Sequence, residues 1–275
     1  MRKSEENTPV ATTLIAACAI VLLALTGCTS QGFFCPPRGG GPSQSAPDAA
    51  PPTCGALRVW YSFDESVGPV IDQSGCGNHG MATASVARDQ PGAFGRSFHF
   101  GGSGFVEAPS SVSLGHLDAF TVEAWLYHDD NGWFDTIVDN YNFIFTTGSN
   151  SEPELSLDDT LICYGWGTYG ATPSLTPGSW HHAAVSVDPA TQEMVFYIDF
   201  SAVETTMVDL AYCDSHQPLT VGIMASGASH THSLPWNGRI DELKIWGVAR
   251  SAAEICGDGG GQWNNGLCEP PPRCD

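Results

Sequence analysis

The chain has 275 residues, with 30 acidic and 10 basic side chains and a formal net charge of −20. This charge repels nucleic acid and anionic membrane surfaces, so it excludes nucleic-acid binding and favours the binding of cations. The length allows one folded domain of about 200 residues with flanking segments.

The N-terminus has the pattern of a secretory signal. Arg2 and Lys3 precede an apolar run over 14–25, and this run is too short for a spanning helix, which needs about 20 apolar residues. Residues 25–28 (Leu-Thr-Gly-Cys) resemble the lipobox of bacterial lipoproteins. The resemblance implies that residues 1–27 are a signal peptide and that Cys28 carries the lipid. The alternative is an ordinary secretory signal with an incidental cysteine.

The residue after Cys28 bears on location. The usual sorting rule requires aspartate there for retention at the inner membrane, and the chain has Thr29, so we expect a lipid-anchored protein of the outer membrane. Residues 28–53 are rich in proline, glycine and serine. Such a segment cannot bury enough apolar surface to fold, which predicts a flexible tether that holds the folded part away from the membrane.

Eight cysteines remain when Cys18 in the signal and Cys28 are set aside. An even number in an exported protein favours disulfides, although eight cysteines allow 105 pairings. Metal ligation is disfavoured because no Cys-x-x-Cys occurs. The predicted pairs, in order of preference, are Cys54 with Cys256 on either side of the folded body, Cys163 with Cys213, and Cys268 with Cys274.

Short β-rich runs separated by glycine and proline fill the chain after the tether, and no convincing helix appears before 251–255. This pattern predicts an all-β sandwich or barrel. In the run 120–128, Phe120, Val122, Ala124 and Leu126 share one apolar face. The expected strands are 57–63, 96–101, 104–108, 120–128, 136–147, 154–163, 180–188, 193–200, 218–223 and 237–246.

Several segments together resemble the LamG-like jelly roll of the concanavalin A-like lectin and glucanase superfamily. The resemblance implies a two-sheet antiparallel β-sandwich over 54–250, followed by a cysteine-containing extension over 251–275. Two departures are Cys76, which would allow a disulfide within its loop, and Phe200, which stands where the family usually has glycine. The matching segments are WYSFDES, VIDQSGCGNHG, GGSGFVEAP, FTVEAWLYHD, SWHHAAVSVD, FYID and GRIDELKIW.

The loop 72–78 combines a carboxylate, carboxamides and glycines, which is the oxygen-rich composition that calcium prefers. In the last strand, alternation places Asp241 on the core face with Leu243 and Ile245, where an isolated carboxylate needs a cation or hydrogen-bond donors. The resemblance implies a structural calcium, and we expect Asp72, Asn78 and Asp241 to hold it. The alternative is that Asp72 and Asn78 form Asx turns and that Asp241 caps backbone amides.

Four aromatic residues lie in or beside polar loops, namely Trp133, Trp166, Tyr169 and Trp236. Exposed aromatic rings stack on the apolar faces of sugars, so the set is a candidate glycan platform. The alternative for each ring is partly buried packing.

Catalysis is not expected. Retaining glycosidases of the superfamily place their carboxylates as Glu-x-Asp-x-x-Glu, and this spacing does not occur; Asp241 and Glu242 are consecutive, so regular alternation would put them on opposite faces. The sequence therefore predicts a non-catalytic surface module that binds a glycan or mediates adhesion. The alternatives are a scaffold that docks an envelope or extracellular protein, and a cryptic glycoside hydrolase. Contact with the membrane is expected only through the lipid.

Overall fold

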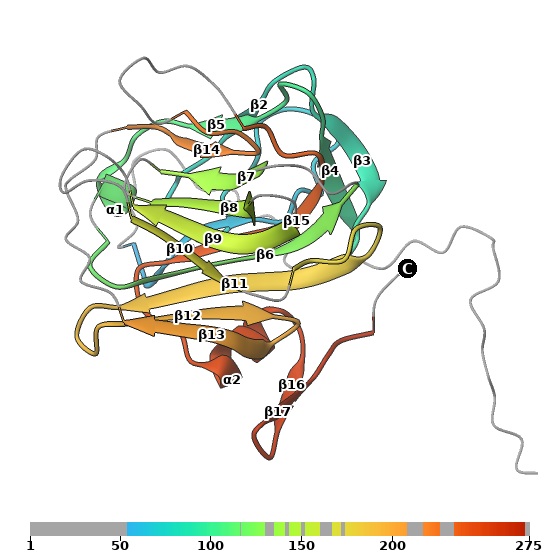
Figure 1. Cartoon of the computed structure of the whole chain (residues 1–275). Coiled ribbons are helices and arrows are strands. Elements are labelled where there is room, and N and C mark those ends of the chain that lie inside the picture. Colours follow the sequence, from blue (N-terminus) through green and yellow to red (C-terminus); the bar gives the residue numbers. More distant parts are fainter. Residues whose placement is uncertain are drawn as a thin grey trace, which may run out of the picture. The chain divides into compact units, whose positions relative to one another are not determined.

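The computed structural model describes residues 54–115, 117–129, 135–140, 143–149, 152–159, 167–171, 174–207, 217–225 and 234–272. For 148–149, 152–159 and 167–171 only the backbone is described. These residues form two packed antiparallel sheets (Figure 1), which confirms the predicted β-sandwich. Within the described ranges, no helix is long and apolar enough to cross a membrane.

The first sheet runs in the order β13-β12-β11-β6-β15-β4-β3, and β1 pairs with β15 beside this path. Its strands are β1 (Leu57–Tyr61), β3 (Ala87–Pro91), β4 (Arg96–Phe100), β6 (Phe120–His128), β11 (Trp180–Asp188), β12 (Glu193–Ile198), β13 (Ser201–Met207) and β15 (Gly238–Trp246).

The second sheet runs in the order β10-β9-β8-β7-β14-β5-β2. Its strands are β2 (Met81–Ala82), β5 (Val106–Ala108), β7 (Asp135–Asp139), β8 (Phe143–Ser149), β9 (Glu152–Asp159), β10 (Gly167–Ala171) and β14 (Leu219–Val221); a short helix, α1 (Val112–Gly115), precedes β6. The single strand expected over 136–147 is therefore two strands, β7 and β8.

The main core lies between the two sheets. The predicted apolar face of β6 is buried there, with Phe120, Val122, Ala124 and Leu126 all fully buried. Phe120 stacks on Phe143 of the opposite sheet, with ring centroids 4.6 Å apart. The period-two pattern of β6 thus correctly predicted which of its side chains face the core.

A β-bulge in β15 interrupts this alternation. Glu242 has φ of 51°, and the pairing with β6 shifts between Asp241 and Lys244. Ile240 and Leu243 consequently both face the core, and Asp241 turns to the outer face beside Trp125. The prediction that Asp241 shares the core face with Leu243 and Ile245 is wrong because a bulge adds one residue to the count.

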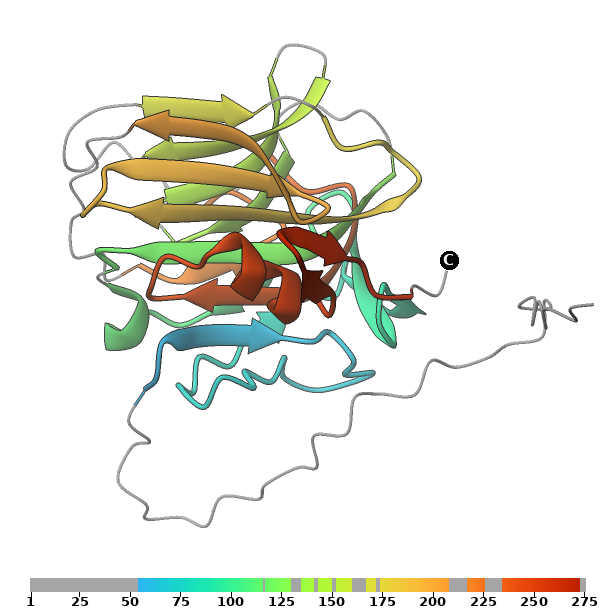
Figure 2. The same ribbon diagram turned by 90° about the horizontal axis from the view of Figure 1, so that it is seen from below.

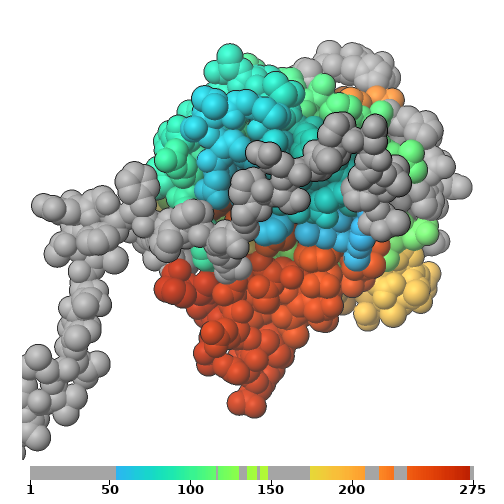
Figure 3. All heavy atoms as spheres, turned by 180° about the vertical axis from the view of Figure 1, so that it is seen from behind, coloured from blue at the N-terminus to red at the C-terminus, as the bar shows by residue number. Residues whose placement is uncertain are grey.

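A third layer covers the outer face of the first sheet. It comprises α2 (Ala252–Asp258) and a hairpin of β16 (Gln262–Asn264) and β17 (Leu267–Glu269), which lie below that sheet in Figure 1 and in front of it in Figure 2. Ser251 and Glu254 form a capping box at the start of α2, and Ile255 and Cys256 are buried against the sheet. In Figure 3 the red C-terminal residues adjoin the blue residues around β1. The C-terminal segment is thus part of the folded body.

The outer core explains why Phe200 stands in the β12–β13 turn. Asp199 and Phe200 have φ of 47° and 68°, a region that costs energy for residues with a side chain. The Phe200 ring stacks on His182 at 4.6 Å and meets Trp125 at 5.8 Å. Burial of a large ring therefore offsets the strain that a glycine would avoid.

The disulfides differ from the expected pairs. Cys54 is joined to Cys76, and Cys256 is joined to Cys268. The predicted pair Cys54 with Cys256 is therefore wrong, because each observed bond closes a local loop instead of joining distant parts of the chain. The predicted pair Cys268 with Cys274 is wrong because Cys268 is bonded to Cys256. Cys76 does add a disulfide to its loop. Cys163, Cys213 and Cys274 lie outside the described residues.

Candidate functional site

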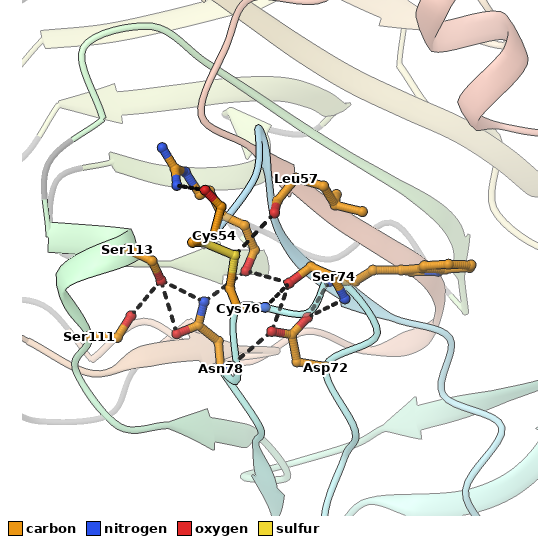
Figure 4. Close-up of a disulfide and its surroundings, with 10 residues drawn as sticks. Cys54, Leu57, Asp72, Ser74, Cys76, Asn78, Ser111 and Ser113 are labelled. Atoms are coloured by element: carbon orange, nitrogen blue, oxygen red, sulfur yellow. Dashed lines mark hydrogen bonds between the residues drawn. A yellow bond between two sulfur atoms is a disulfide. The ribbon is translucent and has the colours of Figure 1, made fainter. Parts of the chain in front are cut away.

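The Asp72 loop is closed by its own hydrogen bonds (Figure 4). Asp72 Oδ1 accepts hydrogen bonds from the backbone of Trp60 at 3.0 Å and of Ser74 at 2.9 Å. Its Oδ2 accepts from the Ser74 hydroxyl at 2.8 Å and from the Asn78 backbone at 2.9 Å. Both carboxylate oxygens are thus engaged by protein donors, as in an Asx turn.

Asn78 is also engaged within this loop. Its amide nitrogen donates to the Arg58 carbonyl at 2.7 Å, and its amide oxygen accepts from the Ser113 hydroxyl at 3.3 Å. Asp241 lies on the outer face of β15 and bonds to a different turn. The structure therefore places Asp72 and Asn78 in one loop and Asp241 against a different turn, and the unbulged register of β15 that grouped Asp241 with the other two residues is wrong.

Asp241 instead faces the turn between β3 and β4. Its Oδ2 accepts a hydrogen bond from Phe94 N at 2.9 Å, and Asp64 Oδ1 accepts one from Arg96 N at 2.8 Å. A Cβ on Gly92 would lie 2.6 Å from both Asp241 Oδ2 and the Arg96 carbonyl oxygen, and a Cβ on Gly95 would lie 2.7 Å from Asp64 Oδ1. The two glycines thus leave room for two carboxylates and a carbonyl oxygen.

The electrostatics of this site favour a cation. Asp241 is fully buried, and its Oδ1 has no hydrogen-bond partner among the described residues. Burial, together with the charges of Glu242 and Asp64, holds the pKa of Asp241 well above its usual range, and the nearby backbone N–H groups of Phe94 and Glu242 only partly offset this. Burial also raises the pKa of Asp64.

These residues fit a hard cation better than the predicted set does. No group of three or more His, Cys, Asp or Glu side chains able to hold a metal ion is found in the described part of the chain. The Asp64 and Asp241 carboxylates and the Arg96 carbonyl nevertheless supply oxygen ligands of the type that calcium binds, with water able to complete the shell. The orphaned Oδ1 of Asp241 is the atom that such an ion would satisfy.

A second buried polar cluster lies beneath α2, and no motif in the sequence predicted it. Glu123 is fully buried; its carboxylate accepts a hydrogen bond from Trp246 Nε1 at 2.7 Å and lies 3.3 Å from His182 Nε2. Burial alone would raise the pKa of Glu123, but these two partners and the charge of Lys244 hold it below its usual value. The signal available in the sequence was a lone carboxylate within an apolar strand.

The same cluster is linked to the C-terminal helix. Lys244 Nζ donates to the Asp258 carbonyl at 2.5 Å, and Arg250 donates twice to the Asp258 carboxylate, from Nε at 3.0 Å and Nη2 at 2.7 Å. The Arg250 guanidinium also lies over the Trp246 ring at 4.1 Å. These contacts hold α2 on the outer sheet face.

The candidate glycan platform is only partly described. Trp236 is fully buried in the main core and packs edge-on against His128 at 4.7 Å, so its assignment as an exposed ligand-binding residue is wrong. Tyr169 lies in β10 opposite Leu157. Trp133 and Trp166 lie outside the described residues, and their role stays a prediction.

The bulge also changes the argument about catalysis. Trp60 Nε1 donates to Glu242 Oε2 at 2.9 Å on the outer side of β1, so Asp241 and Glu242 do not simply alternate between faces. The expected separation of these two carboxylates by regular alternation is therefore wrong. Burial is a different obstacle to catalysis, because the 92–95 turn covers Asp241.

The two-sheet antiparallel sandwich with a capped outer face defines a jelly-roll domain. A model of the concanavalin A-like lectin/glucanases superfamily, Laminin_G_3, matches residues 100–256, which is more than half of the chain. The chain belongs to this family. Comparison with curated protein sequences finds no match.

Solved structures share the fold at low sequence identity. Domain 4 of AbnA, a GH43 extracellular arabinanase from Geobacillus stearothermophilus in complex with arabinotriose, has a TM-score of 0.57 and 18% identity, over 74% of this chain and 97% of that chain. Botulinum neurotoxin type C, whose cell entry depends on interaction with two ganglioside molecules, has a TM-score of 0.53 and 16% identity, over 73% of this chain and 50% of that chain. The binding domain of botulinum neurotoxin serotype D/C has a TM-score of 0.54 and 14% identity, over 73% of this chain and 50% of that chain. The chain spans about half of these toxin structures.

Proposed function

We propose that this protein is a non-catalytic carbohydrate-binding module on the cell surface. The observation that carries the proposal is the likeness to AbnA domain 4, a separate domain of the same fold that was solved with a bound sugar oligomer and is covered over 97% of its length. The ganglioside-dependent toxin is a second relative in fold that engages a glycan. The loops that the sequence predicts around Trp133 and Trp166 at the rim of the sandwich are our candidates for the contact surface.

The absence of catalysis is part of the proposal. Retaining hydrolysis needs two carboxyl groups about 5 to 5.5 Å apart that both reach the sugar. Asp241 and Glu123 are fully buried, so a polysaccharide cannot reach either carboxyl group. We expect no release of reducing ends from arabinan or laminarin, and turnover of either polymer would support the cryptic hydrolase instead.

A glycan array with the purified full chain tests the binding function. We expect binding to at least one glycan class, and Trp133→Ala or Trp166→Ala to weaken it about tenfold, which corresponds to about 1.4 kcal/mol. Trp263→Ala is the matched control, because Trp263 is 39% exposed on the C-terminal hairpin, outside the rim loops. An array without binding, combined with capture of an envelope protein, would favour the scaffold alternative.

We also propose a structural calcium, held by Asp64, Asp241 and the Arg96 carbonyl. When bound, the ion would neutralise two carboxylates and fix the 92–95 turn against the outer face of β15. An ion that binds only the folded state raises its stability. We expect calcium to raise the melting temperature of the full chain relative to EDTA, and equal melting temperatures would contradict the proposal.

Attachment to the outer membrane through a lipid on Cys28 is the third part of the proposal. Two or more acyl chains on one cysteine give stable anchoring. On expression in a bacterial host, Cys28→Ala should move the protein from the membrane fraction to the soluble fraction. Cys18→Ala is the matched control, because Cys18 lies in the predicted signal. A wild-type chain that is already soluble would contradict the anchor.

A further inference from the structure

We propose that the loop 72–78, cross-linked by Cys54–Cys76, is a mechanical clamp that carries tension entering the domain from the N-terminal tether. The inference rests on the proposed function, because a ligand-bound module on a tether is loaded through the residues before Cys54. The clamp itself is built from contacts between described residues.

β1 is the first strand that such tension reaches, and its pairing in the sheet is weak. Among the described strands it pairs only with β15, through Leu57 to Trp246 and Val59 to Ile245 at its N-terminal end, and the register shifts between these two pairs. A pull that lifts Leu57 away from the sheet would break the antiparallel hydrogen bonds one after another, starting at this irregular end. Without further support, β1 would be the point of failure.

The loop 72–78 grips the opposite edge of β1. Gln73 N donates to the Trp60 carbonyl at 2.9 Å, and Trp60 N donates back to Asp72 Oδ1 at 3.0 Å. The Arg58 carbonyl accepts from both the Ser74 hydroxyl at 3.0 Å and the Asn78 amide at 2.7 Å. The loop therefore acts as a second partner for β1, made largely of side chains.

The loop is itself fastened to the rest of the domain. Val70 and Gly80 exchange backbone hydrogen bonds of 2.7 and 2.9 Å at its base. At its far end, the buried Asn78 side chain hydrogen bonds with the Ser113 hydroxyl, and the Tyr61 hydroxyl donates to the Asn78 carbonyl. Figure 4 shows the contact between Asn78 and Ser113 beside the disulfide.

The Cys54–Cys76 bond completes the clamp. Cys54 is the first described residue, three positions before β1, and Cys76 lies within the loop. Tension that arrives at Cys54 is divided between the backbone that leads into β1 and the covalent link to the loop. The contacts of β1 with β15 and those of the loop must then break together, so the rupture force is higher than for β1 alone.

Single-molecule pulling on the full chain tests the clamp. One handle is placed in the tether and the other at Thr191, in the exposed turn between β11 and β12, coupled without adding a cysteine. We expect the double variant Cys54→Ser/Cys76→Ser to have a lower first rupture force and a total extension longer by roughly 70 Å, since the bond spans 22 residues. Asp72→Asn keeps the Cys54–Cys76 disulfide but weakens the hydrogen bonds of the loop, so it should lower the first rupture force less than the double variant does.

Two controls separate the clamp from general destabilisation. Cys256→Ser/Cys268→Ser removes the second disulfide of the described residues, which lies outside the loaded path, and should leave the first rupture force unchanged. Thiol reduction of folded wild-type molecules under load should reproduce the double variant even if that variant folds poorly. Equal rupture forces before and after reduction would overturn the proposal, whereas unchanged glycan binding in the same samples would leave the binding function intact.

Discussion

Glu123→Ala is expected to lower the free energy of unfolding by about 3 to 5 kcal/mol, the combined range for opening a cavity in the core and leaving buried polar groups without a partner. The substitution leaves Trp246 Nε1 and His182 Nε2 without their acceptor in the outer core and also opens a cavity. Chemical denaturation at neutral pH measures the loss. Glu123→Gln keeps the volume and an acceptor oxygen, so its loss should be smaller.

Glu193→Ala is the matched control, because Glu193 lies on β12 of the same sheet and is exposed. Its effect should stay within about 0.5 kcal/mol. The pKa of Glu123 is lowered on folding, so its contribution is fully present above its ordinary value of 4.5 and is lost as the pH falls through the folded value. The difference between wild type and Glu123→Ala should therefore shrink in acid; a loss no larger than that of Glu193→Ala would contradict the role of the cluster.

The sequence predicted the fold where burial imposes a simple period. The strands expected over 120–128 and 180–188 have the same bounds as β6 and β11, because both strands are central in their sheet and buried over most of their length. β3 and β13 were not predicted. Both are edge strands with largely exposed or half-buried side chains, so no apolar alternation marks them.

The site depended on two features that have no local sequence signal. The first is the bulge at Glu242, a non-glycine residue with positive φ, which moves Asp241 to the outer face and away from the Asp72 loop. The second is disulfide pairing, which depends on which loops meet in space. The Asp72 loop was recognised as an oxygen-rich element; in the structure the Asp72 oxygens accept hydrogen bonds from β1 and from the loop itself.

Asp241→Asn is expected to raise the melting temperature of the calcium-free protein at neutral pH. Burial raises the pKa of Asp241, so the folded state binds this proton more tightly than the unfolded state does, and stability from this group falls as the pH rises above 3.8. Asparagine removes the buried charge while keeping the shape. The advantage of the variant should disappear below pH 3.8, where aspartate is neutral in both states.

Calcium should reverse the order of the two melting temperatures, so that the wild type is more stable than Asp241→Asn. At one hundred times its dissociation constant, calcium would add about 2.7 kcal/mol to the wild type, or about 5 to 10 °C, and little to Asp241→Asn. Asp72→Asn separates the two ligand sets: it weakens the bonds to Trp60 and Ser74 and should lower the melting temperature with or without calcium, yet keep the calcium shift. If calcium still raises the melting temperature of Asp241→Asn but not that of Asp72→Asn, the ion is bound by the Asp72 loop. The reason is that calcium stops stabilising the folded state only when a residue that binds it is replaced.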